Sequence, residues 1–223
     1  LLSFILRLIQ FQFFFQRHCI TAQILANNSY SWILFLDSDI GVVNENRTIE
    51  EYIRKDADII FYDRFYNFEI TAGTYLAKKS PFAIGFLLGW ANFVNRLSVP
   101  FSGTDNGAIH MYMTEIVAPN SSLLRRCWKM YNNTVDYGTL WTYTLCCREA
   151  MKNSSFKKIF IYEKNSLGTF LGYADCPYRG SSFHILEYSA RPGSPTSTAG
   201  TVILIAGPLA RLLQVVNADL ISK

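Results

Sequence analysis

Runs of apolar residues separated by short polar segments predict alternating strands and helices along most of the chain. The continuous apolar run at 32–36, which ends at Asp37, is typical of a strand covered on both faces. Further strands are predicted at 57–62, 69–77 and 158–162, and helices at 15–28, 48–55, 81–94, 104–116 and 142–151. This alternation favours an α/β domain in which helices flank a sheet.

Two of the predicted helices carry a clear start signal. Ser80 precedes Pro81, so Ser80 is expected to cap the helix and Pro81 to occupy its first position. Either Thr104 or Asp105 is expected to cap the helix that follows it.

The two ends of the chain differ from its middle. Residues 1–14 are apolar but interrupted by Arg7, and they are too short for a membrane span, which needs about 20 apolar residues. The segment 191–198 is rich in Pro, Gly, Ser and Thr, as linkers are, and an apolar tail follows it. We therefore expect an N-terminal remnant at 1–14, a folded domain at 15–188, and a linker with a divergent tail at 189–223. Membrane attachment is expected only through an anchor upstream.

Charge and cysteine usage narrow the function classes. The net charge of +4 comes from scattered residues that form no basic stripe, so nucleic-acid binding is not expected. The five cysteines form no Cys-x-x-Cys pair, which disfavours a zinc site. Five N-x-S/T sequences, which begin at Asn27, Asn46, Asn120, Asn132 and Asn153, favour a secretory compartment, where disulfides persist. A cytosolic chain with reduced thiols is the alternative.

Disulfide pairing stays open at the level of sequence. Cys127 with either Cys146 or Cys147 is the candidate bond, and an odd thiol remains in any pairing.

Asp37 and Asp39 are the strongest candidates for chemistry. Two carboxylates at the end of a buried strand carry a large desolvation cost unless something compensates their charge. A divalent cation does so, because hard oxygen ligands suit Mn²⁺ and Mg²⁺. The carboxyl end of a central strand is also where open α/β sheets bind ligands. An ordinary loop of acidic residues is the plainer interpretation of the same pattern.

Several long stretches resemble a known family. The family is a nematode group labelled as a domain of unknown function and placed with the nucleotide-diphospho-sugar transferases. It is similar to galactosyl- and xylosyltransferases of the galactomannan and xyloglucan type. The resemblance covers roughly residues 15–184. It is carried by the stretches RHCITAQIL, WILFLDSDIGVVN, NRTIEEYI, ADIIFYDRFYNFEITAGTYLAKKSPFAIGFLLGWANF and GTDNGAIHMYM.

The resemblance implies a GT-A-like α/β fold with a mixed, mainly parallel sheet flanked by helices. Little sequence precedes the helix at 15–28, so we expect the first βα unit to be missing. It also implies that Asp37-Ser38-Asp39 is a DxD motif that holds Mn²⁺ or Mg²⁺ for a UDP-sugar. His184 falls where such folds supply a third metal ligand.

The resemblance further implies residues around the donor sugar. Asp105 is expected to position the reacting sugar or acceptor, or to stabilise charge at the anomeric carbon. The binding residues are expected to be Asp37, Ser38, Thr71, Ala72, Gly73, Thr104 and Asn106. Thr71 stands where such enzymes carry an asparagine. The other two histidines, His18 and His110, are expected to be structural.

We therefore expect a metal-dependent glycosyltransferase that moves a sugar from a UDP-sugar to a glycan or glycoprotein acceptor. The expected location is the Golgi lumen, with the protein either secreted or a type II membrane protein. One alternative is a pseudo-transferase that binds sugar nucleotide without turnover. Another is a phosphatase of the haloacid dehalogenase type, whose first motif also reads strand, Asp, any residue, Asp, but which needs a downstream acidic pair that is not found near Asp105.

Overall fold

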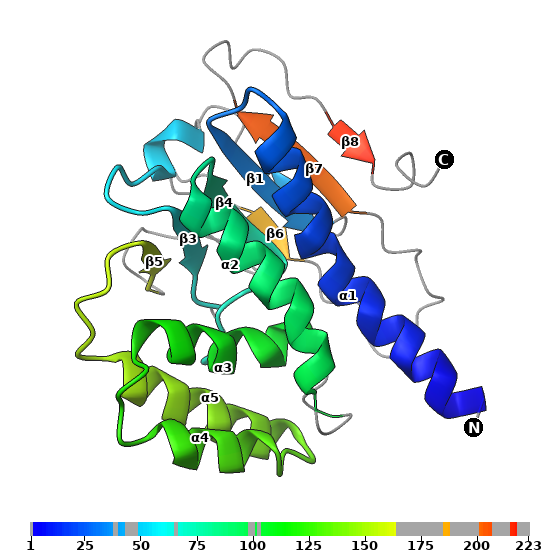
Figure 1. Ribbon diagram of the computed structural model, residues 1–223, viewed down its shortest axis with the longest axis vertical. Helices are drawn as coiled ribbons and strands as arrows, with labels where there is room; N and C mark the ends of the chain where they lie inside the picture. The colour runs from blue at the N-terminus through cyan, green and yellow to red at the C-terminus, as the bar shows by residue number, and fades with distance from the viewer. Residues whose placement is uncertain are drawn as a thin grey trace, which may run out of the picture.

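The computed structural model has a sheet with two long helices packed across it and a stack of three helices beside them (Figure 1). The structure describes residues 2–37, 40–42, 49–64, 67–97, 101, 104–163, 185–187, 201–206 and 215–217. Side chains are described in 13–37, 49–64, 67–97, 101 and 104–163. The expected mixed α/β class is confirmed.

The main sheet has the strand order β5-β3-β4-β1-β7-β8. Its strands are β1 (Trp32–Asp37), β3 (Ile59–Tyr62), β4 (Thr74–Lys78), β5 (Ile159–Tyr162), β7 (Thr201–Ala206) and β8 (Val215–Asn217). A separate pair consists of β2 (Ile40–Val42) and β6 (Ile185–Glu187). The segment expected to be a divergent tail therefore contributes two strands to the main sheet, and β7 pairs directly with β1.

The sheet is not mainly parallel, so that expectation was wrong. Among the described strand pairs only β3 and β5 run parallel, while β4 runs antiparallel to both β3 and β1. A parallel neighbour requires a long crossover, usually through a helix. The described residues between β3 and β4 contain no helix, and Asp63 forms an antiparallel bridge with Ile70. The chain therefore turns back on itself.

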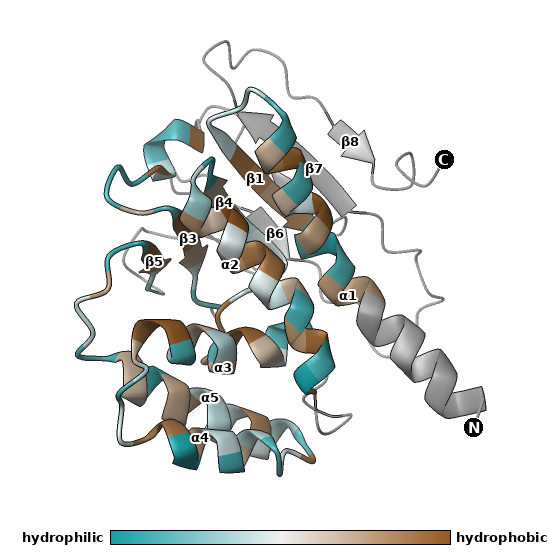
Figure 2. Ribbon diagram, in the orientation of Figure 1, coloured by the Kyte–Doolittle hydropathy of each residue, from teal (hydrophilic) through white to brown (hydrophobic). Residues whose placement is uncertain are grey.

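Strand β1 is buried on both faces, as its continuous apolar run predicts. Ile33 and Phe35 belong to the main core between sheet and helices, whereas Leu34 and Leu36 belong to a second cluster on the opposite face. Figure 2 shows the hydrophobic colour along β1 and β3. Burial of each such side chain contributes roughly 1.5–3 kcal/mol, so these strands hold the site in a fixed frame.

Helix α1 (Leu2–Asn27) starts well before residue 15, where sequence predicted its beginning. Its buried stripe consists of Phe15, His18, Ala22 and Leu25, each at most 1% exposed. The spacing of three to four residues is that of one helix face. Within the described residues, no helix combines the length and the apolar character needed to cross a bilayer.

Helix α2 (Pro81–Asn92) begins as predicted. The Ser80 hydroxyl accepts a hydrogen bond from the backbone of Ala83 at 3.1 Å, and Pro81 stands in the first turn. A short 3-10 helix, η2 (Phe93–Arg96), continues it. The helix predicted at 48–55 is reduced to a single 3-10 turn, η1 (Ile49–Tyr52).

Three helices form the stack beside the sheet. They are α3 (Asp105–Val117), α4 (Leu124–Tyr131) and α5 (Tyr137–Met151). Helix α5 begins five residues earlier than predicted, because Asp136 and Thr139 form a capping box. Sequence reasoning missed α4, which buries Cys127 and Tyr131 and keeps its basic residues exposed.

A disulfide joins two helices of this stack. Cys127 of α4 and Cys146 of α5 are bonded, with their Cα atoms 5.6 Å apart. This is one of the two pairings that sequence left open. Cys147 is a buried thiol, and burial raises its pKa to about 12.

Two glycines of α2 give a matched test of helix packing. A Cβ on Gly89 would lie 2.1 Å from the hydroxyl of Tyr112, whereas a Cβ on Gly85 meets nothing within 4 Å. Tyr112 cannot move freely, because its hydroxyl donates to the carbonyl of Phe86 at 3.1 Å. Gly85→Ala should raise the free energy of unfolding by about 0.5–1 kcal/mol through helix propensity. Gly89→Ala should lower it by about 1–3 kcal/mol through overpacking.

Urea unfolding followed by circular dichroism measures both variants. Equal effects at the two positions would contradict this account of the contact between α2 and α3.

Candidate functional site

The candidate site lies at the carboxyl end of β1. Asp37 is the last residue of the strand, and its side chain is 29% exposed. Its backbone N–H donates to the carbonyl of Gly73 at 2.8 Å, which ties the end of β1 to the segment before β4. One carboxylate of the expected DxD motif therefore lies at a sheet edge that solvent reaches. Ser38 and Asp39 lie outside the described residues.

The structure brings Thr71, Ala72 and Gly73 to the same place. Thr71 and Ala72 are fully buried, and the N–H of Thr71 donates to the carbonyl of Tyr62 at 3.1 Å. A Cβ built on Gly73 would lie only 2.6 Å from Oδ2 of Asp37. A residue larger than glycine would therefore displace the carboxylate from its position against this segment.

Asn106, near the start of α3, joins this group from a third part of the sequence. Its Oδ1 accepts hydrogen bonds from the backbone of Ala72 at 3.2 Å and from Nη2 of Arg64 at 3.4 Å. Two hydrogen bonds thus link these parts of the chain. One joins the backbone of Asp37 to that of Gly73, and the other joins the backbone of Ala72 to the side chain of Asn106. Sequence predicted these residues as parts of one site, and the structure brings them together.

The residue that joins the two acidic positions is Arg17 of α1, which sequence reasoning missed. Its Nη1 forms an ion pair with Oδ1 of Asp37. Its Nε donates to Oδ2 of Asp105 at 2.9 Å, and Nη2 binds the same oxygen. Burial by itself would lower the pKa of Arg17, but the carboxylates of Asp105 and Asp37 outweigh burial and raise it. Arg17 is therefore a fixed cation, with a side chain only 7% exposed.

His18 holds the other side of the Asp105 carboxylate. Its Nε2 lies 2.9 Å from Oδ2 of Asp105, and its Nδ1 lies 3.0 Å from the hydroxyl of Tyr75. Burial lowers the pKa of His18 to about 4, so the ring is neutral at pH 7. Because a carboxylate only accepts, the proton must be on Nε2, and Nδ1 accepts from Tyr75. The ring also stacks on Trp90, with centroids 3.5 Å apart.

The structure places the Asp105 side chain in the core. It is 0% exposed, and its carboxylate faces Arg17 and His18. Its expected role beside the reacting sugar stays a prediction. Burial would raise the pKa of Asp105, but Arg17 and His18 outweigh burial and lower it, which keeps the carboxylate ionised. Through Arg17, the Asp105 carboxylate is linked to Asp37. Thr104 is at the N-cap position of α3 but makes no capping hydrogen bond with its side chain.

The expected metal ligands are described only in part. Asp37 offers a partly exposed carboxylate, whose oxygens suit Mn²⁺ or Mg²⁺. Asp39 and His184 lie outside the described residues. Within the described part of the chain, no three His, Cys, Asp or Glu side chains are grouped as a metal site. Of the three expected metal ligands, the described residues therefore include one, Asp37.

The two histidines that were expected to be structural, His18 and His110, are both buried. His110 is 0% exposed, and its Nε2 accepts a hydrogen bond from the backbone of Ile70 at 3.1 Å. His18 is equally buried, but it also orients the acidic cluster. The sequence contained a signal for His18, and Arg17 stands next to it. His18 falls on the apolar stripe of α1, and a polar side chain buried on such a stripe requires hydrogen-bond partners.

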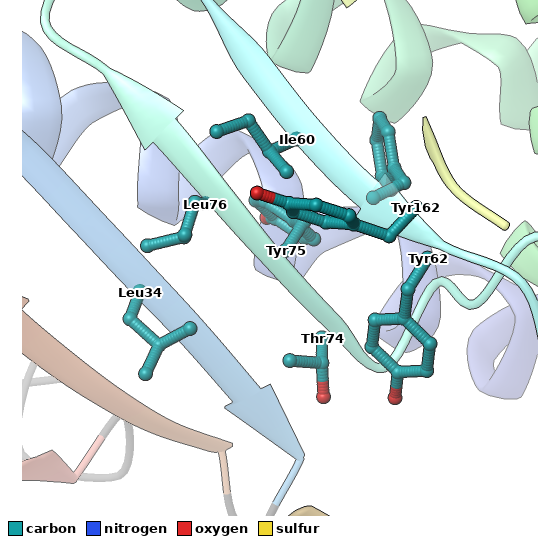
Figure 3. A pocket seen from close by; sticks show the side chains of 8 residues that line it. Leu34, Ile60, Tyr62, Thr74, Tyr75, Leu76 and Tyr162 are labelled. Carbon is teal, nitrogen blue, oxygen red and sulfur yellow. The ribbon is translucent and has the colours of Figure 1, made fainter. Parts of the chain in front are cut away.

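A shallow pocket lies on the opposite face of the sheet (Figure 3). It is lined mainly by side chains of β1, β3, β4 and β5, among them Leu34, Ile60, Tyr62, Thr74 and Tyr162. The lining contains hydroxyl groups but no charged side chain that could offset the negative charge of a diphosphate. The candidate site therefore remains the cluster around Asp37.

Comparison with known proteins places the chain in a family. The family model described as "Protein of unknown function, DUF273" matches residues 8–176, which is most of the chain. The chain belongs to this family. No curated protein and no solved structure matches the chain. The part matched by the DUF273 model includes Arg17, Asp37, the segment 71–73 and Asp105, and thus the whole described cluster.

Removal of the buried carboxylate should destabilise this DUF273 domain. Asp105→Asn leaves Arg17 with one carboxylate in place of two, and breaking a buried ion pair costs about 3–5 kcal/mol. Asp56→Asn is the matched control, because Asp56 pairs with Arg54 at the surface, with the side chains 56% and 42% exposed. Surface pairs contribute little, so the control should unfold like the wild type. Urea unfolding at pH 7 provides the measurement, and similar values for both variants would contradict the role of Asp105.

Stability should fall as the pH is lowered from 6.5 towards 4. His18 and His110 have folded-state pKa values of about 4 and about 3, below the ordinary 6.5. Between these values the unfolded chain binds protons that the folded chain does not, so acid favours unfolding. For His18 alone the difference corresponds to roughly 3 kcal/mol.

Urea unfolding at pH 7, 6 and 5 should show this loss, and His110→Gln should show a smaller one. A free energy of unfolding that stays constant over this range would contradict the burial of two neutral histidines.

Proposed function

We propose that this chain is a metal-dependent glycosyltransferase that transfers a sugar from a UDP-sugar to a glycan or glycoprotein acceptor. The observation that carries the proposal is the convergence of Asp37, residues 71–73 and Asn106 at the end of a central strand. These residues span about 70 positions of the sequence, yet two hydrogen bonds link them. One joins the backbone of Asp37 and Gly73, and the other joins the backbone of Ala72 to the side chain of Asn106. Residues with no common role have no reason to assemble in this way.

In the proposed site, Asp37 is a ligand of Mn²⁺ or Mg²⁺, together with Asp39 and His184. When bound, the cation offsets the negative charge that develops on the leaving UDP. Arg17 fixes the Asp37 carboxylate, and Asp105 and His18 in turn fix Arg17. Preorganised charges of this kind require no rearrangement during the reaction.

The proposed cellular setting is the lumen of the secretory pathway, with the Golgi as the expected compartment. The Cys127–Cys146 disulfide supports this setting, because disulfides persist in oxidising compartments. The proposed partners are the UDP-sugar and the acceptor glycan. No nucleic acid is proposed.

A pseudo-transferase is the second candidate, and one observation favours it. Asp105, which the resemblance implies to act beside the reacting sugar, is 0% exposed and engaged by two neighbours. A chain with this arrangement could bind a sugar nucleotide although no Asp105 carboxylate lies beside the sugar. The two candidates differ in turnover and agree in Mn²⁺-dependent binding of UDP.

The deciding experiment measures UDP binding by calorimetry with and without Mn²⁺, together with release of UDP from a panel of UDP-sugars. Mn²⁺-dependent binding with release of UDP supports the transferase. Binding without release supports the pseudo-transferase. Absence of binding in both conditions, for a chain that circular dichroism shows to be folded, contradicts both.

Two variants test the site itself. Asp39→Ala should abolish the Mn²⁺-dependent part of UDP binding by removal of a ligand. Gly73→Ala should weaken it at least about tenfold, because the added Cβ displaces Asp37. Gly138→Ala is the matched control, since its Cβ would meet nothing closer than 3.5 Å. If Gly73→Ala binds UDP as tightly as the wild type, Asp37 is not part of the binding site.

A further inference from the structure

Four of the five N-x-S/T sequences fall on described residues, and the asparagine is exposed in each. Each lies where a helix ends or the chain turns. Asn27 ends α1, and Asn120 lies in the turn between α3 and α4. Asn132 directly follows α4, and Asn153 comes two residues after the end of α5. An acceptor asparagine must face solvent in the folded chain, because an attached glycan is bulky and hydrated.

Three of these asparagines lie far from the cluster around Arg17. Asn27 follows Arg17 by ten residues of helix, which corresponds to about 15 Å. Asn120 and Asn153 lie at the opposite end of α3 from Asp105, about 18 Å along the helix. Ser154 donates to the carbonyl of Val117 at 2.7 Å and so holds these two turns together. Glycans at the three positions would leave the candidate site open.

The disulfide is an independent sign of the same compartment. Cys127 and Cys146 are bonded, and disulfides form in the oxidising lumen where N-linked glycans are also attached. Exposed acceptor sequences alone occur by chance in cytosolic chains. The bond makes chance a weaker explanation here.

Asn132 differs from the other three in its local structure. The hydroxyl residue of its acceptor sequence, Thr134, is 1% exposed, and its Oγ1 donates to the carbonyl of Tyr131 at 3.0 Å. The corresponding residues of the other sequences, Ser29, Ser122 and Ser155, are exposed. Asn132 also lies inside the loop closed by the Cys127–Cys146 bond. Once α4 and α5 are packed and bonded, the Thr134 hydroxyl is not accessible to a modifying enzyme.

We propose that the chain carries N-linked glycans on Asn27, Asn120, Asn132 and Asn153, and that Asn132 is modified before the Cys127–Cys146 bond closes. The co-substrate is a lipid-linked diphosphate oligosaccharide. The bond from its anomeric carbon to the diphosphate oxygen breaks, and a bond from that carbon to the asparagine amide nitrogen forms. The amide nitrogen loses one proton, and the lipid diphosphate leaves.

The sites are tested in the full chain produced in cultured animal cells. Treatment with peptide N-glycosidase in ¹⁸O-water, followed by peptide mass spectrometry, marks each modified asparagine. All four should be marked, and each Asn→Gln variant should lose one glycan. The chain carries an added secretion signal that directs it to the lumen, so an unmarked chain would overturn the proposal.

The order of events is tested on folded chain produced in bacteria, which carries no glycan. Oxidised chain and chain with reduced, blocked cysteines are each offered to purified oligosaccharide transferase and its lipid-linked donor. Asn132 should be modified at least about tenfold less in the oxidised chain, while Asn153, outside the disulfide loop, should change little. Equal modification of Asn132 in both forms would overturn the proposed order. Neither test depends on the proposed glycosyltransferase activity of this chain itself.

Discussion

The structure of the candidate site depends on one buried cation. Arg17 is 7% exposed, and a guanidinium removed from water to that extent is stable only with close compensation. Asp105 and Asp37 provide it from two other elements, α3 and β1. The ion pairs therefore fix where the first helix sits relative to the sheet edge and to the helix stack. Packing of apolar surface alone would tolerate small shifts between these elements, whereas the charges do not.

The surroundings of Asp105 follow from the same constraint. Its carboxylate needs donors on every side, and Arg17, His18 and the backbone of Asn106 supply them. Asn106 in turn orders Ala72, and so the segment that lies against Asp37. The aromatic rings of Trp90 and Tyr75 enclose His18 and keep water out. A low local dielectric strengthens each of these contacts and makes the loss of any one costly.

Sequence patterns predicted the parts of the fold that local chemistry decides. The apolar run of β1 and the Ser80-Pro81 start of α2 were located correctly, because burial and capping act over a few residues. Strand direction was wrong, because it depends on the path of the chain between β3 and β4. The helix α4 was missed although its apolar and polar faces are clearly separated. Its eight residues are shorter than the window of about 11–18 residues in which helical periodicity is usually read.

The site was predicted in part, for a similar reason. Asp37 was identified from its position after a buried strand, and Gly73 and Asn106 from the family resemblance. The structure links all three. Arg17 was not, since its partners are 20 and 88 residues away and no local pattern encodes such a pairing. The orientation of Asp105 has a similar origin. The sequence gives the residue type, but the direction of the side chain is set by Arg17 and His18.

Charge balance gives a physical reason to expect a cation beside Asp37. Arg64 and Glu69 beside the cluster form an ion pair whose charges cancel. The cluster otherwise contains one cation, Arg17, and two carboxylates, Asp37 and Asp105, while the low pKa of His18 keeps that ring neutral. The cluster therefore carries a net charge of minus one, and Asp39, which follows Asp37 by two positions in the sequence, has a further carboxylate. Carboxylates near one another repel unless a counter-charge joins them. A divalent ion would bring this set to neutrality, whereas a monovalent side chain would not.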